Sequence, residues 1–344
     1  MSIGIVKHDI YLQHETDAYH PENPKRLEHI YRMLENLDRT QLDYIEPRMA
    51  TQDELALNHT LSYIHEIAST NGHPHTYLDG DTVASAKTYE AACMAAGGVL
   101  ELVDAILSNR VHSGFAFVRP PGHHAEQGKA MGFCIFNNIA IAARYLRRRH
   151  GMNSILIVDF DLHHGNGTQH SFYKEKDVLY FSTHQYPYYP GSGWYEEIGS
   201  EQGTGYTVNV PMSQGMGDED YVYAFRDVLL PVAEMYRPEI ILVSAGFDTY
   251  YKDPLGGMEV TESGFSAMTR ILMDLAQRCC EGKLLFVLEG GYDLKGLAAS
   301  TEAVLTELQG YSEHLFEGKK EVSSSLVQMT ASLKRLLLPY WGHF

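Results

Sequence analysis

Two short apolar runs that lead into charged residues constrain this chain more than any other feature. Residues 155–158 read Ile-Leu-Ile-Val, and residues 240–243 read Ile-Ile-Leu-Val. Such runs are typical of strands in a parallel sheet that helices cover on both faces. Asp161 and His163 follow the first run, and Asp248 follows the second. Because the loops after strands build active sites, we expect these three residues to be functional.

The same three residues form a set of ligands for a divalent metal. Asp161 and His163 are two residues apart, so on an extended chain their side chains point to the same side. Two carboxylates and one imidazole suit an ion that keeps one position open for water. A single Asp or His is more often a cap or a surface group. Several of them directly after a buried strand favour a cation, because burying them without one is costly.

Four segments resemble the zinc-dependent histone deacetylases of the arginase/deacetylase superfamily. They are PPGHHA at 120–125, VDFDLHHGNGTQ at 158–169, SAGFD at 244–248 and LEGGYDL at 288–294. The resemblance extends from HPENPKR at residues 20–26 to about Leu308. Asn166 within GNGTQ and the DPLGG segment at 253–257 resemble the class II branch.

The resemblance implies a role for each residue of the predicted site. Asp161, His163 and Asp248 would be the zinc ligands. Tyr292 would supply the hydroxyl that polarises the substrate carbonyl. The tandem histidines would be His123, with Asp159 as its partner, and His124, with Asn166 as its partner. A carboxylate favours an imidazolium, whereas a neutral amide does not. We therefore predict that His124 is the neutral base that takes a proton from water.

The resemblance also implies a substrate channel. Phe133, after Gly132, and Tyr189 would be its aromatic walls, and Leu255 would contact the substrate. Ordinary packing is the alternative for both aromatic residues. Arg26 resembles an internal arginine where released acetate could be held.

Two structural sites for K⁺ or Na⁺ are implied by the resemblance alone. One comprises Asp159, Asp161, His163, Ser182 and Thr183, and the other comprises Phe172, Glu175, Val178 and Tyr206. Most of these ligands would be backbone carbonyls, which leave little trace in side-chain identity.

Alternating strands and helices predict an α/β fold with three αβα layers around a central, mostly parallel sheet, as in arginase and deacetylases. Strands are predicted at 114–118, 154–159, 178–183, 206–210, 239–244 and 284–288. One helix is predicted to have Asn23 as its N-cap and Pro24 as its first residue, and another is predicted over 85–107. We expect one deacetylase domain over residues 1–344. Residues 313–344 would be its C-terminal helical extension, with an amphipathic helix around Leu326, Met329 and Leu333 that docks on the body or on another subunit.

Charge and composition exclude several classes. A formal net charge of −17 argues against direct nucleic-acid binding but suits cationic substrates. The sequence lacks an apolar run of membrane-spanning length and a signal-peptide profile, so a cytoplasmic protein is expected. Cys93 and Cys134 are expected in helices as reduced core thiols, outside the metal site. Whether the chain forms a homo-oligomer is left open.

Three functions are compatible with this reading. The first is hydrolysis of N-ε-acyl-lysine in peptides or proteins, which releases acetate and free lysine. The second is the same chemistry on acetylpolyamines; eukaryotic relatives selective for polyamines carry glutamate at the position of Leu255, so leucine favours acyl-lysine. The third is a non-catalytic acyl-lysine-binding protein. One zinc per chain is expected, although the ligand types also permit iron.

Overall fold

A parallel sheet of eight strands forms the centre of the molecule. The computed structural model describes residues 2–310, 316, 318 and 321–342. The strands are β1 Ile3–Val6, β2 Leu42–Tyr44, β5 Ser113–Ala116, β6 Ile155–Asp159, β7 Val178–Gln185, β8 Thr207–Met212, β9 Ile240–Ala245 and β10 Leu284–Leu288, in the spatial order β2-β1-β5-β10-β9-β6-β7-β8. Neighbouring strands pair in parallel throughout this order. The predicted parallel sheet is confirmed.

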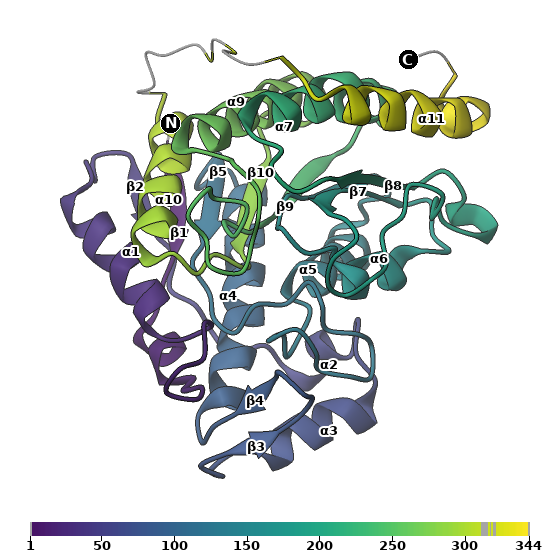
Figure 1. Cartoon of the computed structure of the whole chain (residues 1–344). Helices are drawn as coiled ribbons and strands as arrows, with labels where there is room; N and C mark the ends of the chain where they lie inside the picture. The colour runs from purple at the N-terminus through teal and green to yellow at the C-terminus, as the bar shows by residue number, and fades with distance from the viewer. Residues whose placement is uncertain (1, 311–315, 317, 319–320, 343–344) are drawn as a thin grey trace.

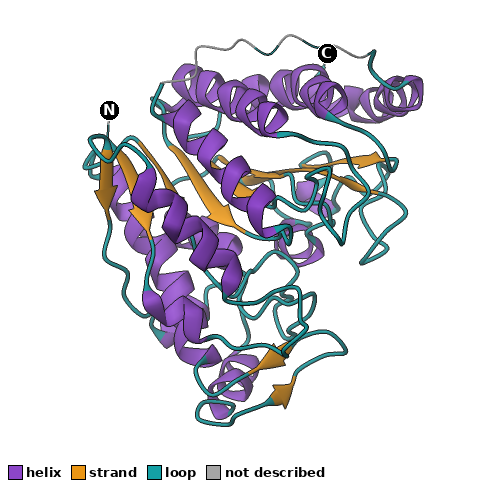
Figure 2. Ribbon diagram, turned by 60° about the vertical axis from the view of Figure 1, so that its left-hand side comes forward, coloured by secondary structure: helices purple, strands orange, loops and turns teal. Residues whose placement is uncertain are grey.

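Helices cover both faces of the sheet, so the fold has the three predicted layers (Figures 1 and 2). The α-helices of the described residues are α1 Lys25–Asn36, α2 Gln52–Leu55, α3 Leu61–Ser69, α4 Thr88–Leu107, α5 Asn138–His150, α6 Asn166–Phe172, α7 Asp218–Ala224, α8 Leu230–Tyr236, α9 Glu262–Cys280, α10 Leu294–Leu308 and α11 Ser324–Trp341. On one side α1, α9 and α10 pack together, and on the other side α4 packs on α5. A separate antiparallel hairpin contains β3 Thr76–Tyr77 and β4 Val83–Ala84.

The two apolar runs that predicted the fold lie side by side at the middle of the sheet. β6 pairs with β9 and β7, and all residues of β6 and β9 are buried. In this register Asp159, at the end of β6, lies between Ser182 of β7 and Ser244 of β9. Burial on both faces explains why neither strand alternates polar and apolar residues.

Local predictions fail in three places. Helix α1 begins at Lys25, with Pro24 as its N-cap residue, because the Asn23 side chain accepts the Lys25 N–H at 3.1 Å and forms a turn before the helix. Cys134 lies in the loop before α5 and not in a helix. Strands β1 and β2 escaped prediction, because they are short and β1 contains Gly4, which weakens the strand signal.

The C-terminal helix docks on the body of the molecule. Leu326, Leu333, Leu337 and Trp341 of α11 are buried, while Met329 is half-buried. The indole N–H of Trp341 donates to the Gly205 carbonyl at 2.7 Å, just before β8. An amphipathic helix was predicted here, and it packs on the body, which is one of the two partners that the sequence left open. The predicted start of the extension at residue 313 lies outside the described residues.

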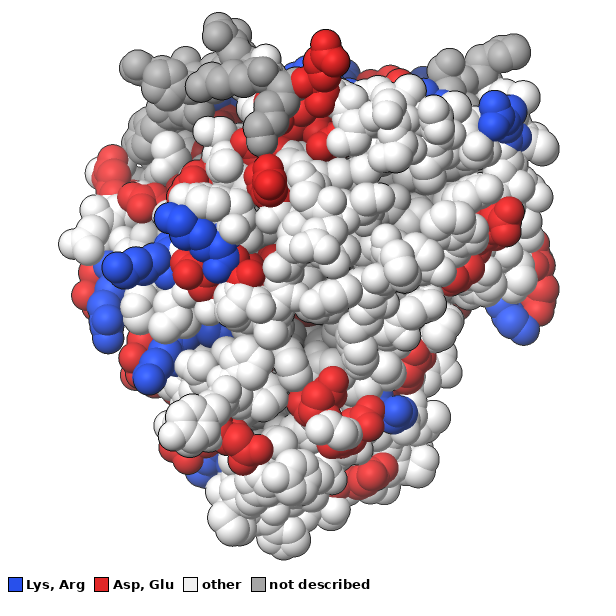
Figure 3. Space-filling view, viewed as in Figure 1, with Lys and Arg blue, Asp and Glu red and all other residues white. Residues whose placement is uncertain are grey.

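The surface carries acidic and basic side chains unequally. On the face shown in Figure 3, groups of acidic residues surround a largely uncharged central area. In the part of the chain that the structure describes, every helix is too short or too polar to cross a membrane.

Candidate active site

Four loops meet at the carboxyl edge of the sheet and carry most of the predicted site. They are residues 119–125 after β5, 160–164 after β6, 246–248 after β9 and 289–292 after β10. Backbone donors tie the loops together: the Leu162 N–H donates to the Asp248 carboxylate at 3.0 Å, and the Gly290 N–H donates to Asp161 at 2.8 Å. Parallel neighbouring strands therefore bring residues far apart in the sequence to one place.

The three predicted metal ligands are gathered as a group. Asp161, His163 and Asp248 each offer a ligand atom within 4.8 Å of the others. His163 Nδ1 lies 2.9 Å from Asp248 Oδ2 and 3.2 Å from Asp161 Oδ1. A Cβ at Gly290 would come within 2.6 Å of both carboxylates, so glycine keeps this space free.

The donor set fits a divalent ion such as Zn²⁺. Both carboxylates are buried, and two buried carboxylates beside one imidazole carry excess negative charge that a cation would neutralise. Nitrogen and oxygen ligands in this number also suit zinc with an open coordination position. The ligand set therefore supports the predicted metal.

The tandem histidines have different partners, as the resemblance implied. His123 Nδ1 lies 3.1 Å from the Asp159 carboxylate, and His124 Nδ1 lies 2.8 Å from Asn166 Oδ1. The Asn166 amide nitrogen donates to the Glu126 carboxylate at 2.5 Å, which fixes the amide oxygen towards His124. A neutral His124 then carries its proton on Nδ1, so its Nε2 is free to accept one.

The pKa values of the two imidazoles shift in opposite directions, because carboxylates face His123 whereas burial and neighbouring histidines dominate at His124. Burial alone would lower the pKa of His123, but the Asp161 and Asp159 carboxylates outweigh it and raise the pKa to about 10. Burial, followed by the neighbouring His123 and His163, holds the pKa of His124 well below its ordinary value. The pair thus combines one charged and one neutral ring, with ring centres 4.0 Å apart.

Tyr292 stands on a glycine turn beside the pocket. Gly291 has a φ of +118°, in the region that favours glycine, and the Tyr292 N–H donates to Asp253 at 2.6 Å. Burial raises the pKa of Tyr292 well above its ordinary value, so its hydroxyl keeps its proton near neutrality. The side chain is therefore available as a hydrogen-bond donor.

The predicted channel residues line one pocket with the catalytic candidates. Gly132, Phe133, Tyr189 and Leu255 all contribute to its wall, together with His124 and Tyr292. The Phe133 ring meets the Tyr292 ring edge-on at 5.9 Å, and the Tyr189 ring meets His124 at 5.2 Å. These aromatic residues border the pocket instead of filling the core.

Asp81 is a pocket residue that the sequence did not reveal. Its carboxylate accepts the Gly132 N–H at 3.2 Å, and Thr82 Oγ1 accepts the Phe133 N–H at 3.0 Å. Phe133 has a φ of +68°, an unfavourable conformation for an aromatic residue, which these two bonds hold in place. A lone acid in a loop before β4 has no motif that would have marked it.

Arg26 belongs to a buried charge cluster beneath Tyr292. Its guanidinium lies 5.0 Å from the centre of the Tyr292 ring and donates to the Gly291 carbonyl at 2.7 Å. It also donates to Glu22 at 3.0 Å, and Glu22 accepts from Arg119 as well. We name Glu22, Arg26 and Arg119 the arginine–glutamate cluster. Glu22 and Arg119 were not predicted, and acetate binding at Arg26 stays a prediction.

The monovalent-cation sites also stay predictions. At the first, Asp159 pairs in register with Ser182, and the buried Thr183 hydroxyl has no hydrogen-bond partner among the described residues. Such an orphaned oxygen is compatible with a cation ligand. At the second, the Phe172 carbonyl accepts the Glu175 N–H at 2.9 Å, while the Glu175 carboxylate pairs with two arginines of α5. A cation there would rely on backbone carbonyls, including those of Val178 and Tyr206.

Known proteins share both the sequence and the fold. The sequence model of the family described as histone deacetylase domain matches residues 20–308. Histone deacetylase 15 of Arabidopsis thaliana is 44% identical over 85% of the chain and 53% of its own length. Polyamine deacetylase HDAC10 of Danio rerio is 38% identical over 94% of the chain and 49% of its own length. The chain thus spans about half of these two relatives.

Other matches extend over the whole chain. A probable deacetylase of Archaeoglobus fulgidus is 35% identical, with 100% of both chains covered. The crystal structure of the HDA15 HD domain superposes with a TM-score of 0.92 at 40% identity and covers 99% of this chain and 95% of its own. The sheet and its flanking helices thus form the arginase/deacetylase fold that was predicted. The chain belongs to the histone deacetylase family of hydrolytic deacetylases.

Proposed function

We propose that the chain is a zinc-dependent amidohydrolase that removes the acetyl group from N-ε-acetyl-lysine in peptides or proteins. The observation that carries this proposal is the tandem His123 and His124, hydrogen-bonded to Asp159 and Asn166 respectively, beside a set of nitrogen and oxygen ligands. A charged and a neutral imidazole at one reacting centre can supply positive charge and a base together.

Each residue would have one task in the reaction. Zinc held by Asp161, His163 and Asp248 supplies Lewis acidity to the amide carbonyl and lowers the pKa of water. The Tyr292 hydroxyl donates to the carbonyl oxygen, where negative charge develops. His124 Nε2 takes a proton from the attacking water and returns it to the leaving nitrogen, so that acetate and a free amine are released. His123, held by Asp159, stays protonated and stabilises the negative charge.

The pocket wall supports a lysine side chain as the substrate. Phe133 and Tyr189 offer aromatic faces to an apolar four-carbon stem, and Leu255 adds apolar surface. A remote ammonium, as on a polyamine, would find no carboxylate at Leu255. We therefore favour acyl-lysine, in keeping with the class II character of the sequence.

Acetylpolyamines are the second candidate because Asp81 also lines the pocket. A carboxylate there can attract a cationic substrate. Relatives named polyamine deacetylase HDAC10 match the chain at 38–40% identity. The cytoplasm stays the predicted compartment, and curated relatives include forms named chloroplastic.

The deciding experiment compares kcat/KM of the zinc-loaded protein on an acetyl-lysine peptide, acetylputrescine and acetylspermidine. We expect a preference for the peptide, and a loss of about 10²- to 10³-fold in Tyr292→Phe because one donor to the developing oxyanion is removed. A polyamine preference would keep the chemistry and replace the substrate. Binding of the peptide without turnover would favour the non-catalytic alternative.

A further inference from the structure

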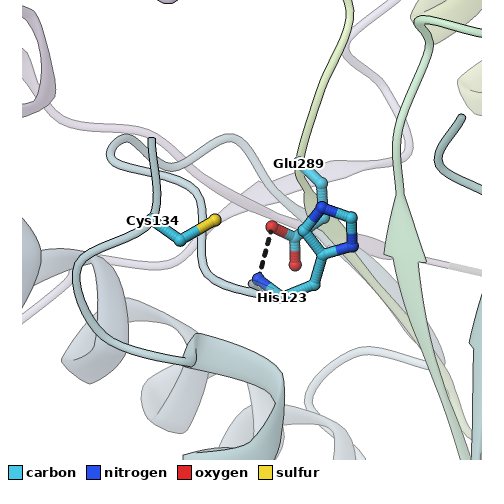
Figure 4. Close-up of side chains that lie close together, drawn as sticks. All are labelled: His123, Cys134 and Glu289. Carbon is cyan, nitrogen blue, oxygen red and sulfur yellow. Dashed lines mark hydrogen bonds between the residues drawn. The ribbon is translucent and has the colours of Figure 1, made fainter. Parts of the chain in front are cut away.

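We propose that His123, Cys134 and Glu289 form a second, inhibitory metal site that takes thiophilic divalent ions such as Cd²⁺ or excess Zn²⁺. Each residue offers a ligand atom, and the three atoms lie within 4.8 Å of one another (Figure 4). We name these residues the His–Cys–Glu group. The site goes beyond the proposed hydrolysis, because occupancy would block the reaction.

The group is buried, yet it adjoins the pocket. Cys134 and Glu289 have no exposed surface, and His123 is only 3% exposed. His123 and Cys134 both line the same pocket as Phe133 and Tyr292. An ion would thus enter by the substrate route and bind where water is excluded.

Glu289 and His123 can each offer an atom to an ion without losing the hydrogen bonds that they make in the structure. Glu289 Oε2 accepts the N–H groups of Gly122 and His123 at 2.7 and 3.1 Å, whereas Oε1 accepts the Ser244 hydroxyl alone among the described residues, at 3.0 Å. A carboxylate oxygen has two lone pairs, so Oε1 retains one. Asp159 occupies His123 Nδ1, which leaves Nε2 as the ligand atom.

Sulfur distinguishes this group from the predicted zinc ligands. Thiolates favour soft ions, whereas Asp161, His163 and Asp248 offer only nitrogen and oxygen. Bonds of about 2.0–2.3 Å place tetrahedral ligands roughly 3.3–3.8 Å apart, so ligand atoms within 4.8 Å of one another need to close by at most about 1–1.5 Å. On binding, the Cys134 thiol and the Nε2 of the protonated His123 each release a proton to water, and the sulfur and Nε2 then bond to the ion.

Occupancy would remove His123 from its proposed role. The imidazole would bind the ion through Nε2 and could no longer carry a proton on that atom. The ion would also lie beside the pocket that His123, Cys134 and Gly290 line. We therefore expect bound Cd²⁺ to lower kcat, measured at saturating substrate, because His123 would no longer supply its charge.

The test titrates Cd²⁺ into zinc-loaded protein and follows the ultraviolet charge-transfer band of the Cd–thiolate bond. The reference protein carries Cys279→Ser and Cys280→Ser, because that adjacent pair offers other thiols. Cadmium exchanged into the Asp161, His163 and Asp248 set gives no such band. We expect one equivalent of Cd–thiolate, lost in Cys134→Ser and retained in the matched control Cys93→Ser, a buried thiol on α4.

A second variant protects the test against misfolding. Near-ultraviolet circular dichroism reports the folded state, and Glu289→Gln keeps the thiol while it removes a charged ligand. We expect Cd²⁺ to bind about tenfold more weakly or worse in this variant. Absence of the band in the reference protein, its persistence in Cys134→Ser, or unchanged affinity in folded Glu289→Gln would overturn the site. The band requires no turnover, so the result stands apart from the proposed hydrolysis.

Discussion

Two buried charge clusters flank the glycine turn that carries Tyr292, and they differ in how their charge is neutralised. We name Asp161, His163 and Asp248 the metal-ligand set. The Gly290 N–H donates to Asp161 of this set, and the Gly291 carbonyl accepts from Arg26 of the arginine–glutamate cluster. In the arginine–glutamate cluster, two guanidiniums donate to one carboxylate and to several backbone carbonyls. In the metal-ligand set, two carboxylates lie beside one imidazole.

The difference separates a structural cluster from a ligand site. A buried charge with a hydrogen-bonded partner from its own chain is stable without a ligand. The two guanidiniums and one carboxylate of the arginine–glutamate cluster leave one positive charge, and backbone carbonyls accept its remaining guanidinium donors. Two carboxylates beside an imidazole that must be neutral to bind an ion leave two negative charges, and such an excess is costly and marks a place for a counter-ion. We therefore expect changes in the metal-ligand set to affect activity first, and changes in the arginine–glutamate cluster to affect stability first.

The largest effect should come from the metal-ligand set. Asp248→Asn removes one charged ligand, so zinc content should fall and kcat/KM should drop by about 10³-fold or more, since the ion contributes several kcal/mol to the transition state. Metal analysis and steady-state kinetics measure both. Removal of zinc with a chelator should give the same loss in the unaltered protein and be reversed by added zinc. Full activity after chelation would contradict the zinc dependence on which the comparison of the two clusters rests.

The tandem histidines should be unequal. His124→Ala should lower kcat by about 10³-fold because it removes the neutral base, and His123→Ala should cost less because His123 supplies only charge. Rates at saturating substrate and equal zinc loading decide this. Equal losses in kcat would refute the division of roles and would leave the opposite pKa directions without consequence for catalysis.

The arginine–glutamate cluster should respond in stability. Glu22→Gln leaves two buried guanidiniums without their carboxylate and should lower the free energy of unfolding by about 3 kcal/mol, measured in urea. Glu28→Gln is the matched control, since its ion pair with Arg32 is exposed and should contribute less than about 1 kcal/mol. If both variants unfold alike, the buried cluster has no special structural role.

The smallest predicted effect is a change of substrate preference. Leu255→Glu places a carboxylate at the pocket wall and should shift the ratio of kcat/KM for acetylputrescine over peptide by about tenfold towards the polyamine, through attraction of the remote ammonium. Leu255→Met keeps an apolar wall and should retain the peptide preference. An unchanged ratio in Leu255→Glu would remove this position from substrate selection.

Local pattern explains why much of the site was predictable. The apolar runs before Asp159 and Asp248 define strands, and neighbouring parallel strands end at one edge. The segments that carry His123, His124 and Tyr292 are contiguous motifs. By contrast, Glu22 is buried against Arg119 although 97 residues separate them, and no local signal reports that pairing. Asp81 and Cys134 likewise join the pocket only through the folding of separate loops.

The sequence by itself determined the parallel sheet, the family and the candidate metal ligands, because short-range patterns of polarity and residue type encode them. The tertiary structure decided which charges compensate one another, where the C-terminal helix docks and that Cys134 approaches His123 and Glu289. The physical reason is that charge compensation and burial depend on distances between segments. Those distances follow from packing of the whole core, and not from the spacing of residues along the chain.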